Sequence, residues 1–292
     1  MPSRLKLAVV IPTLNESSFI ASCLESVSLG SRNHVQTVVV VDGGSDDNTP
    51  DIVRSTPMAT HILGTVLENT SPNRGIQLDK GARKCLDMSA DKRIDVLLFV
   101  HADTILPANY AEHIAEALKD GQMWGAWEAW HPRLENKQKS LDPCIDAVSL
   151  FARLRSKHLG VAYGDQCLFM RREAYEAVGG FQHWPLLEDL NMARALKEKF
   201  GYPSLIPVEK SVVFTSMRRY RKLGSAPTCL LNNMLVCMWR SGYTTPQGAA
   251  SIYYGVDRFV DRITNLACDN ILVDGIDGII GGLVSLRNSL LG

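Results

Sequence analysis

Apolar runs alternate with amphipathic stretches through the first hundred residues. Three apolar runs predict strands, at residues 7–11, 36–41 and 96–100. Three stretches with apolar residues at three- and four-residue steps predict helices, at residues 17–27, 49–54 and 74–87. Short apolar runs bounded by polar residues are typical of strands buried on both faces of a parallel sheet. The pattern therefore favours an α/β fold with right-handed crossovers.

The second half of the chain is less regular and indicates a mixed sheet followed by helices. We expect strands at residues 121–129, 166–171, 204–207 and 211–215, and helices at residues 145–155, 173–178 and 187–200. The charged residues 132–141 predict a loop. Apolar residues recur at helical spacing over residues 227–239 and 256–286, which predicts helices with one apolar face.

The length of 292 residues suits one large α/β domain with an extension. We expect the domain to span residues 1–222, with halves at 1–104 and 105–222, and a helical extension to span residues 223–292. Lys plus Arg and Asp plus Glu both number 31, so the bulk charge does not favour nucleic acid as a partner.

Cysteine use and hydropathy both bear on the compartment. The seven cysteines show no CxxC pair and no regular spacing, which is typical of reduced thiols in an intracellular compartment. The first apolar run ends at Pro12, which is too short for a signal peptide or a membrane span. The uncharged residues 223–239 and 241–256 contain Pro, Asn, Gln or Thr, so no spanning helix is predicted there. We expect a cytoplasmic protein.

The segment LLFVHADT, residues 97–104, carries the strongest chemical signal. An apolar strand ends there in a polar tip with the carboxylate of Asp103. In open α/β sheets, ligands bind beyond the carboxyl ends of the strands. Asp103 could hold a divalent cation against a phosphate at that place, or it could cap the following turn. The segment by itself leaves both interpretations open.

Two other strand ends also carry polar side chains. The Thr13 hydroxyl and the Asn15 amide suit recognition of a base, although Asn15 or Ser17 could equally cap the next helix. Asp42 could accept hydrogen bonds from a nucleobase or a ribose, or it could form an Asp-Gly turn. Because Asp42 and Asp103 end two strands of one sheet, we expect both carboxylates at the same edge.

Charged residues mark three further positions. Arg74 begins a predicted helix and could offset the charge of a diphosphate by a bidentate contact, or it could lie in solvent. Glu188 and Asp189 open a later helix, where the dipole favours acids and where one acid could be a general base. The basic cluster from Arg218 to Arg221 could bind phosphate or form a solvated surface.

Several common site motifs are missing from the sequence. No GxGxxG follows the first strand and no GxxxxGK[ST] occurs, which disfavours a dinucleotide-binding site and a P-loop. Neither GxSxG nor HExxH is found. The HADT tip invites comparison with aspartyl-phosphate phosphatases, but His101 stands where their nucleophile would be.

Six segments, in order along the chain, resemble the family 2 glycosyltransferases, which have the GT-A fold. They are VVIPTLNE (9–16), VVVVDGGSDDNT (38–49), NRGIQLDKGA (73–82), LLFVHADT (97–104), GDQCLFMRREAYEAVGGF (164–181) and PLLEDLNMARAL (185–196). The HADT and GDQ segments, with TSMRRYRK at residues 215–222, resemble a subgroup of bacterial-type transferases. The resemblance implies a Rossmann-like, mixed but mostly parallel sheet flanked by helices, with a nucleotide-binding half before residue 105 and an acceptor-binding half after it.

The resemblance also implies an activity of the hexosyltransferase type (EC 2.4). A sugar would move with inversion from a nucleotide diphosphate sugar, most often a UDP-sugar, to a hydroxyl of a small molecule, lipid or glycan, with Mg²⁺ or Mn²⁺ as cofactor. By position, Asp189 matches the catalytic base, with Glu188 beside it, and Asp103 and His101 match the metal motif. The residues that match nucleotide-sugar contacts are Pro12, Thr13, Asn15, Glu16, Asp42, Arg74, Gln77, Ala102, Asp165, Gln166 and Arg218.

The sequence departs from the family pattern and leaves two alternatives. His101 replaces the first carboxylate of the usual DxD metal motif, and the QxxRW signature of processive synthases is missing, which disfavours polymer synthesis. A nucleotidyltransferase acting on a sugar phosphate would need a glycine-rich basic loop that PTLNES lacks. A non-catalytic nucleotide-sugar binder would not need both Asp103 and Asp189. The C-terminal helices are expected to cover the sheet, form a homodimer or touch a membrane peripherally.

Overall fold

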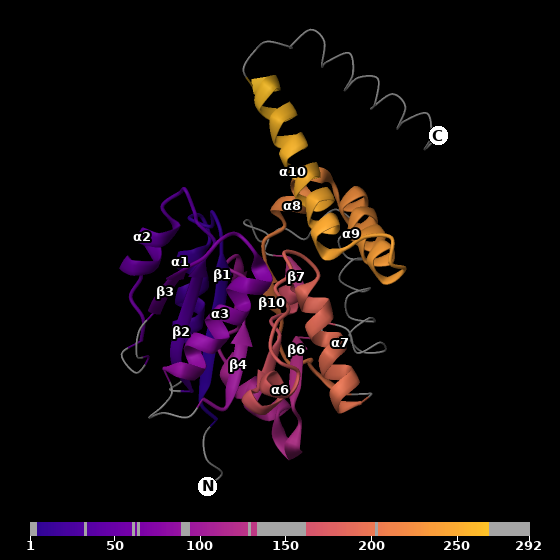
Figure 1. The fold of residues 1–292 in the computed structure, drawn as a ribbon. Coiled ribbons are helices and arrows are strands. Elements are labelled where there is room, and N and C mark those ends of the chain that lie inside the picture. The colour runs from indigo at the N-terminus through magenta and orange to yellow at the C-terminus, as the bar shows by residue number, and fades with distance from the viewer. Residues whose placement is uncertain are drawn as a thin grey trace. The chain divides into compact units, whose positions relative to one another are not determined.

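The structure, a computed structural model, describes residues 5–31, 34–59, 62, 65–88, 94–127, 130–132, 162–201 and 204–268. A seven-stranded sheet forms its centre (Figure 1), with the strands in the spatial order β3 (Thr65–Asn69), β2 (Val35–Asp42), β1 (Leu7–Thr13), β4 (Val96–Phe99), β8 (Phe169–Arg171), β6 (Trp124–Trp127) and β9 (Leu205–Val208). A smaller sheet contains β5 (Thr104–Ile105), β10 (Val213–Thr215) and β7 (Trp130–Pro132).

The main sheet is mixed but mostly parallel. Neighbouring strands run parallel from β3 through β2 and β1 to β4, and β6 is parallel to β9, whereas β8 is antiparallel to both β4 and β6. The register places Thr13 of β1 opposite Asp42 of β2. The expected α/β fold with a mixed, mostly parallel sheet is therefore confirmed.

Helices cover both faces of the main sheet, as Figure 1 shows. One face carries α1 (Ile20–Leu29), α2 (Thr49–Ser55) and α4 (Tyr110–Ala117), and the other carries α3 (Arg74–Asp87), α6 (Arg172–Ala177) and α7 (Glu188–Phe200). Successive side chains of a strand point to opposite faces of the sheet. Val9 packs in the core with α1, whereas Val10 packs in the core with α3. The continuous apolar runs of the strands follow from this burial on both faces.

Local sequence explains where several helices begin and end. The Asn73 side chain accepts a hydrogen bond of 3.1 Å from the Ile76 N–H and caps α3. Pro50 lies in the first turn of α2, where backbone N–H groups have no partner within the helix, so the lack of an N–H costs no hydrogen bond. Gly201 ends α7 with φ at +83°, a conformation that costs glycine little.

The predicted elements agree with the structure except at a few places. The helix expected at residues 74–87 is α3. The strand expected at residues 121–129 begins later, at Trp124 of β6, because residues 119–121 form a 3₁₀ turn, and its residues 128–129 lie outside the described residues. Three strands, β3, β5 and β7, and two α-helices, α4 and α8 (Arg218–Leu223), were not predicted. Strand β3 has few apolar residues, and the charge of α8 suggested a solvated cluster. The helix expected at 145–155 and residues 133–141 of the expected loop lie outside the described residues.

By their internal contacts, the residues form two compact units, 1–236 and 237–292. Helix α9 (Ser225–Arg240) contains the division, and α10 (Pro246–Cys268) belongs to the second unit. The domain boundary expected at residue 222 stays a prediction. Among the helices that the structure describes, none is both long enough and apolar enough to cross a membrane.

Candidate active site

The ends of three strands meet at the carboxyl edge of the main sheet. Strand β1 ends at Thr13, directly beside Asp42 at the end of β2. Beyond β4, the Val100 N–H donates to the Val10 carbonyl at 3.0 Å, which keeps the following segment beside β1. The HADT tip, which begins at His101, therefore emerges at the same edge as the ends of β1 and β2.

Two loops at this edge are joined to one another, and we call residues 14–17 and 43–49 the paired loops. Side chains of each loop accept backbone N–H groups of the other, in the pairs Asn15 N to Ser45 Oγ (2.8 Å), Asp46 N to Asn15 Oδ1 (3.0 Å), Glu16 N to Thr49 Oγ1 (2.8 Å) and Ser17 N to Asp47 Oδ2 (3.1 Å). Although burial would raise it, hydrogen bonds from Thr49 and Ser17 lower the pKa of Asp47 to about 2. The paired loops are therefore held in place without a ligand.

Asp42 forms the turn that opens the second of the paired loops. Its Oδ2 accepts the N–H groups of Gly44 and Ser45 at 3.0 and 2.9 Å, and its Oδ1 accepts the Ser45 hydroxyl at 2.5 Å. A carboxylate offers about four acceptor sites. The Asp-Gly turn and a ligand contact, which the sequence left as alternatives, are therefore compatible.

Gln77 and Thr13 differ in how their polar atoms are satisfied. The buried Gln77 amide donates to the carbonyls of Thr13 and Val41 at 2.9 and 2.8 Å, so it ties the ends of β1 and β2 together from α3. The Thr13 hydroxyl is buried and has no hydrogen-bond partner among the described residues. Because an unsatisfied buried hydroxyl is costly, Thr13 is placed to gain a hydrogen bond from a ligand.

Beside the paired loops lies a group of ionisable residues that we call the charged centre. His101 lies within electrostatic reach of most of the others. The charged centre consists of Arg74, His101, Asp103, Glu188, Asp189 and Arg218. These residues come from the starts of α3, α7 and α8 and from the tip after β4, so only the fold brings them together.

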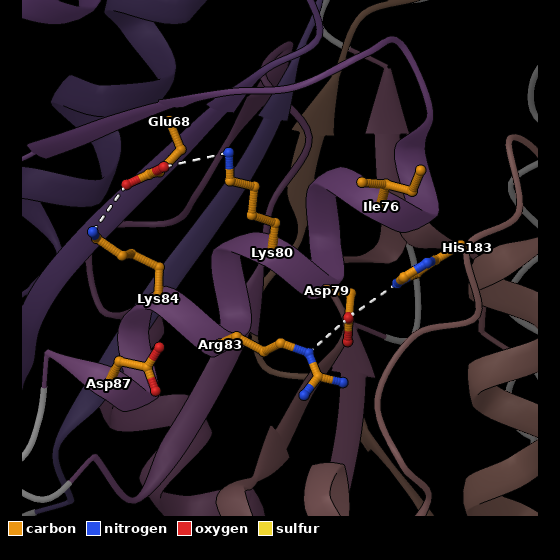
Figure 2. Close-up of a pocket in the computed structure, with 8 residues that line it drawn as sticks. All are labelled: Glu68, Ile76, Asp79, Lys80, Arg83, Lys84, Asp87 and His183. Carbon is orange, nitrogen blue, oxygen red and sulfur yellow. Dashed lines mark hydrogen bonds and ion pairs between the residues drawn. The ribbon is translucent and has the colours of Figure 1, made fainter.

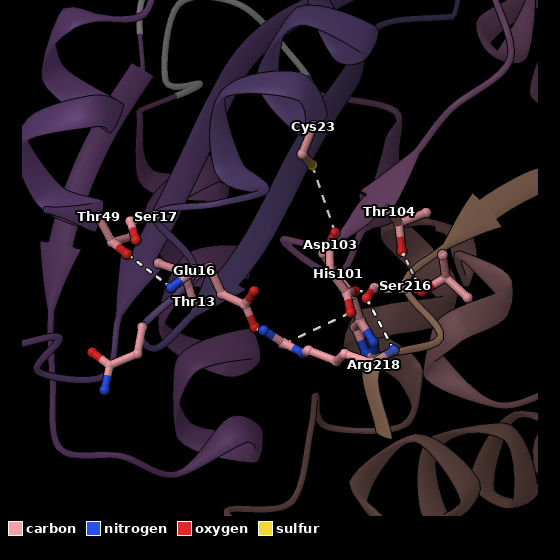
Figure 3. A network of polar contacts seen from close by, with 12 residues as sticks. Thr13, Glu16, Ser17, Cys23, Thr49, His101, Asp103, Thr104, Ser216 and Arg218 are labelled. Carbon is pink, nitrogen blue, oxygen red and sulfur yellow. Dashed lines mark hydrogen bonds and ion pairs between the residues drawn. The ribbon is translucent and has the colours of Figure 1, made fainter. Parts of the chain in front are cut away.

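Arg218 connects the paired loops to the charged centre, as Figure 3 shows. Its guanidinium pairs with Glu16 and lies 3.8 Å from Asp103 Oδ2. The Thr215 hydroxyl donates to Asp103 Oδ1 at 3.3 Å. Burial raises the pKa of Glu16 and the Arg218 contact offsets part of this rise, while Glu16 Oε2 is buried with no hydrogen-bond partner in the part of the chain that the structure describes.

His101 is half-buried, and its imidazole is neutral at pH 7. Burial, and next the nearby charge of Arg74, lower the pKa of its imidazole to about 4. A Cβ added to Gly164 would lie 2.7 Å from His101 Nε2 and 3.3 Å from Asp189 Oδ2, so only glycine leaves room for both side chains. The Gly164 N–H donates to Asp189 Oδ2 at 2.6 Å, and the Leu190 N–H donates to Oδ1 at 2.7 Å. Asp189 is thereby held close to the HADT tip.

Arg74 and Glu188 form an ion pair across the site. Arg74 donates from Nε to Glu188 Oε1 and from Nη2 to Oε2, the second at 3.3 Å. The Glu188 side chain is fully buried, whereas 26% of the Arg74 side chain is exposed. Burial raises the pKa of Glu188, and the Arg74 charge acts in the opposite direction. Glu188 therefore serves first as the partner of Arg74.

Backbone strain gathers around this region. Four residues other than glycine have positive φ among the described residues, and three of them adjoin the site: Asn15 at 55°, Cys167 at 51° and Leu187 at 67°. Such conformations cost energy and persist where the surroundings enforce them. Leu187 directly precedes Glu188, so the strain is stored where α7 begins.

The side chains at the HADT tip fit a divalent cation that brings further ligands with it. Asp103 offers a carboxylate and His101 a neutral imidazole. Within the described ranges, no three His, Cys, Asp or Glu side chains gather closely enough to form a metal site by themselves. Mg²⁺ usually completes its shell with water and phosphate oxygens. A cation at Asp103 would therefore depend on a phosphate ligand.

The remaining predicted residues line the site in other ways. Pro12 lies within β1 opposite Val41, and Ala102 is 3% exposed in the core, so each could reach a ligand only through its backbone. Gln166 is buried and donates to the Trp127 carbonyl at 2.9 Å. Asp165 is half-buried in the same 3₁₀ turn.

Sequence reasoning did not identify Thr215 as a contact of Asp103, nor the pairing of Glu16 with Arg218. The first contact joins residues 112 apart and the second joins residues 202 apart. The segment TSMRRYRK, which begins at Thr215, signalled a basic cluster but not the residues that it would meet.

Comparisons with known proteins agree with this fold. The family "Glycosyl transferase family 2" matches residues 8–179, which is more than half of the chain. A mannosyltransferase, PcManGT from Pyrobaculum calidifontis in complex with GDP-Man and Mn²⁺, is similar with a TM-score of 0.58 and 17% identity, over 97% of this chain and 81% of that one. S. aureus TarS 1–349 in complex with UDP-GlcNAc is similar with a TM-score of 0.53 and 16% identity, over 73% of this chain and 58% of that one.

No curated protein sequence matches the chain. At identities this low, the structural similarity establishes the GT-A fold alone. This chain covers less than two thirds of the length of the TarS fragment.

Proposed function

Because the chain belongs to glycosyltransferase family 2, we propose that it moves a sugar from a nucleotide diphosphate sugar to a hydroxyl group of an acceptor. The observation that carries the proposal is the meeting of Asp189 with the HADT tip around Gly164, beside the paired loops. A carboxylate and a candidate metal ligand thus adjoin the paired loops, as a sugar transfer from a nucleotide sugar requires.

The nucleoside would lie at the ends of β1 and β2. The buried Thr13 hydroxyl lacks a partner among the described residues, and Asp42 retains acceptor capacity beside it. Both can pair with the polar edge of a base or with a ribose. We propose a UDP-sugar as donor, and a GDP-sugar is the competing candidate because PcManGT binds GDP-Man.

The diphosphate would lie against Asp103, His101 and Arg218. Asp103 with His101 would hold Mg²⁺ or Mn²⁺, which when bound would neutralise part of the diphosphate charge. Arg218 already faces Asp103 and Glu16, so it would exchange a carboxylate partner for a phosphate when the donor binds. Arg74 would contribute its positive potential while it remains paired with Glu188.

The transfer would be a single displacement with inversion. The acceptor oxygen forms a bond to the anomeric carbon while the bond from that carbon to the diphosphate oxygen breaks. Asp189 takes the proton of the attacking hydroxyl, and the electron pair of the broken bond leaves with the diphosphate. We assign the role of general base to Asp189 rather than to Glu188, because the Glu188 side chain is fully buried and forms an ion pair with Arg74.

A panel of nucleotide sugars would test the proposal. The melting temperature should rise with one nucleotide sugar, and more in the presence of Mn²⁺, because a ligand that binds only the folded state stabilises it. Release of the nucleoside diphosphate with an acceptor should follow. The proposal is wrong if no nucleotide sugar binds, or if a nucleoside triphosphate and a sugar phosphate react to give a nucleotide sugar.

Metal removal tests the diphosphate site separately. We expect EDTA to weaken donor binding and Asp103→Ala to reproduce this loss, whereas Asp46→Ala at the exposed end of the paired loops should keep the dependence on metal. Donor binding that is equally tight with EDTA would assign the diphosphate to His101 and Arg218 without a cation.

The contacts expected of the C-terminal helices stay predictions. Helix α10 exposes apolar side chains, among them Phe259 at 63% and Ile263 at 43%. Peripheral membrane contact predicts co-sedimentation with liposomes, and a homodimer predicts a doubled mass in solution.

A further inference from the structure

A buried carboxylate on α3, Asp79, lies outside the charged centre and has no part in the proposed reaction. Its Oδ1 accepts the Tyr175 hydroxyl at 2.5 Å, and its Oδ2 accepts Arg83 Nε at 2.8 Å. His183 Nε2 lies 3.1 Å from the same Oδ2, and a ring nitrogen can form a hydrogen bond to a carboxylate only when it carries a hydrogen and donates it. Figure 2 shows Asp79 between Arg83 and His183.

These partners keep Asp79 ionised. Burial would raise the pKa of its carboxyl, but the hydrogen bonds from Arg83, Tyr175 and His183 outweigh burial and lower it. A glycine completes the enclosure, because a Cβ on Gly180 would lie 2.5 Å from Asp79 Oδ1. Three elements therefore converge on one charge: α3, α6 and the segment that follows Gly180.

That segment, residues 180–187, connects α6 to α7, and we call it the bridging segment. Two further contacts hold it to the start of α3. The Gly75 N–H donates to the Trp184 carbonyl at 3.0 Å, and Asn73 Nδ2 donates to the His183 carbonyl at 3.2 Å. A Cβ on Gly75 would lie 2.7 Å from Trp184 N, so the backbones touch there.

The bridging segment ends where α7 begins. Its last residue, Leu187, has φ at +67°, a strained conformation that the surroundings must maintain. Glu188 and Asp189 follow at once. A shift of the bridging segment on α3 would therefore move the backbone of Asp189 relative to the Gly164 N–H that its side chain accepts.

We propose that Asp79, acting through His183, is a positioning residue for the sugar transfer: it holds the bridging segment so that Asp189 keeps its direction toward the acceptor hydroxyl. This inference rests on the proposed function. A displacement of about 1 Å in a reacting group can lower a rate by about 10²-fold, so loss of the anchor acts on turnover more than on donor binding.

The test compares two carboxylates that face the same groove on α3. Asp79→Asn keeps the shape of the side chain but removes the negative charge to which Arg83, Tyr175 and His183 form hydrogen bonds. Glu68→Gln breaks the ion pairs of Glu68 with Lys80 and Lys84, which fasten α3 to β3 and do not touch the bridging segment. We expect Asp79→Asn to lower kcat about 10- to 100-fold with the donor KM within about threefold, and Glu68→Gln to leave both unchanged.

A second pair of variants avoids any folding defect at the buried position. The His183 side chain is 61% exposed, so substitutions there leave the core intact. His183→Phe removes the donor and should lower kcat about 3- to 10-fold, whereas His183→Gln keeps an N–H for Asp79 and should restore it. Equal kcat values for these two variants would overturn the proposal.

Hydrogen exchange separates this inference from the proposed function. Amides of residues 181–190 should exchange faster in Asp79→Asn than in the wild type or Glu68→Gln, with or without UDP as a probe. Unchanged exchange there, or equal loss of kcat in Asp79→Asn and Glu68→Gln, would overturn the positioning role. A wild-type protein that transfers no sugar would instead refute the proposed function, and the exchange result would still stand.

Discussion

The paired loops and the charged centre adjoin each other but are stabilised in different ways. In the paired loops, backbone N–H groups of one loop donate to side chains of the other, and the geometry is complete without a ligand. In the charged centre, carboxylates and guanidiniums offset one another at short range, and Glu188 is fully buried. The first region is held by hydrogen bonds between two loops, and the second is held by ion pairs between charged side chains.

The difference teaches how the two regions should respond to substitution. A neutral hydrogen bond contributes about 1 kcal/mol, whereas removing one partner of a buried ion pair leaves an uncompensated charge that costs about 3–5 kcal/mol. Changes in the charged centre should therefore have large effects on rate or stability. Changes in the paired loops and at the strand ends below them should have smaller and more additive effects.

The largest effect is expected from Asp189→Asn. Loss of the general base should lower kcat by about 10³-fold, while the donor still binds because the paired loops are untouched. Transfer assays together with equilibrium binding of UDP would measure the two effects. Glu198→Gln, on an exposed ion pair of the same helix, is the matched control and should keep full turnover. Near-normal turnover of Asp189→Asn would assign the base elsewhere.

Arg74→Met should give the largest loss of stability. It leaves the buried Glu188 carboxylate without its partner and should lower the free energy of unfolding by about 3 kcal/mol, as measured by urea denaturation. Arg194→Met breaks the exposed Arg194–Glu198 pair and should cost less than about 0.5 kcal/mol. The double variant Arg74→Met with Glu188→Leu should regain most of the loss, and if it does not, the uncompensated charge of Glu188 is not the cause.

Gln77→Leu should have an intermediate effect. The buried amide joins the Thr13 and Val41 carbonyls, so its loss should cost about 1–2 kcal/mol of unfolding free energy and weaken nucleotide binding at the strand ends. Gln36→Leu, near the opposite end of β2, is the matched control for stability alone. Tight nucleotide binding by Gln77→Leu would show that the ends of β1 and β2 keep their spacing without the hydrogen bonds from Gln77.

The smallest effect is expected from Asp47→Asn, and it should depend on pH. The folded-state pKa of Asp47, about 2, lies below its ordinary value of 3.8, so its carboxylate stabilises the fold above about pH 4 and that contribution fades as the pH falls toward 2. At pH 7 the variant should be about 1 kcal/mol less stable than the wild type. Thermal unfolding between pH 7 and pH 3 should show the difference narrowing in acid; a constant difference would contradict this assignment.

The elements that local pattern controls were predicted well. The strands through Val9 and Val38 and the helix at residues 74–87 follow from runs and spacings within one segment. Strand β3 was missed because its pairing with β2, rather than its own residues, makes it a strand. The basic segment at Arg218 was not predicted as a helix, since charge patterning says little about tertiary partners.

The candidate site was predictable as a set of residues but not as a set of contacts. Asp42 and Asp103 could be placed at one edge of the sheet, because parallel strands present their carboxyl ends together. The sequence could not show that Arg74 would pair with Glu188, because 114 residues separate them. It also could not show that His101 would be half-buried with a lowered pKa, because burial is a property of the assembled fold.

The sequence by itself determined the α/β architecture and the residues at the strand ends, because hydrophobic period and turn chemistry act over a few neighbouring positions. Only the tertiary structure decided which charges meet, that Gly164 leaves room for His101 beside Asp189, and that Asp79 fastens the bridging segment. The physical reason is that Coulomb interactions and desolvation depend on distance in space and on burial, and neither is written in the order of the residues.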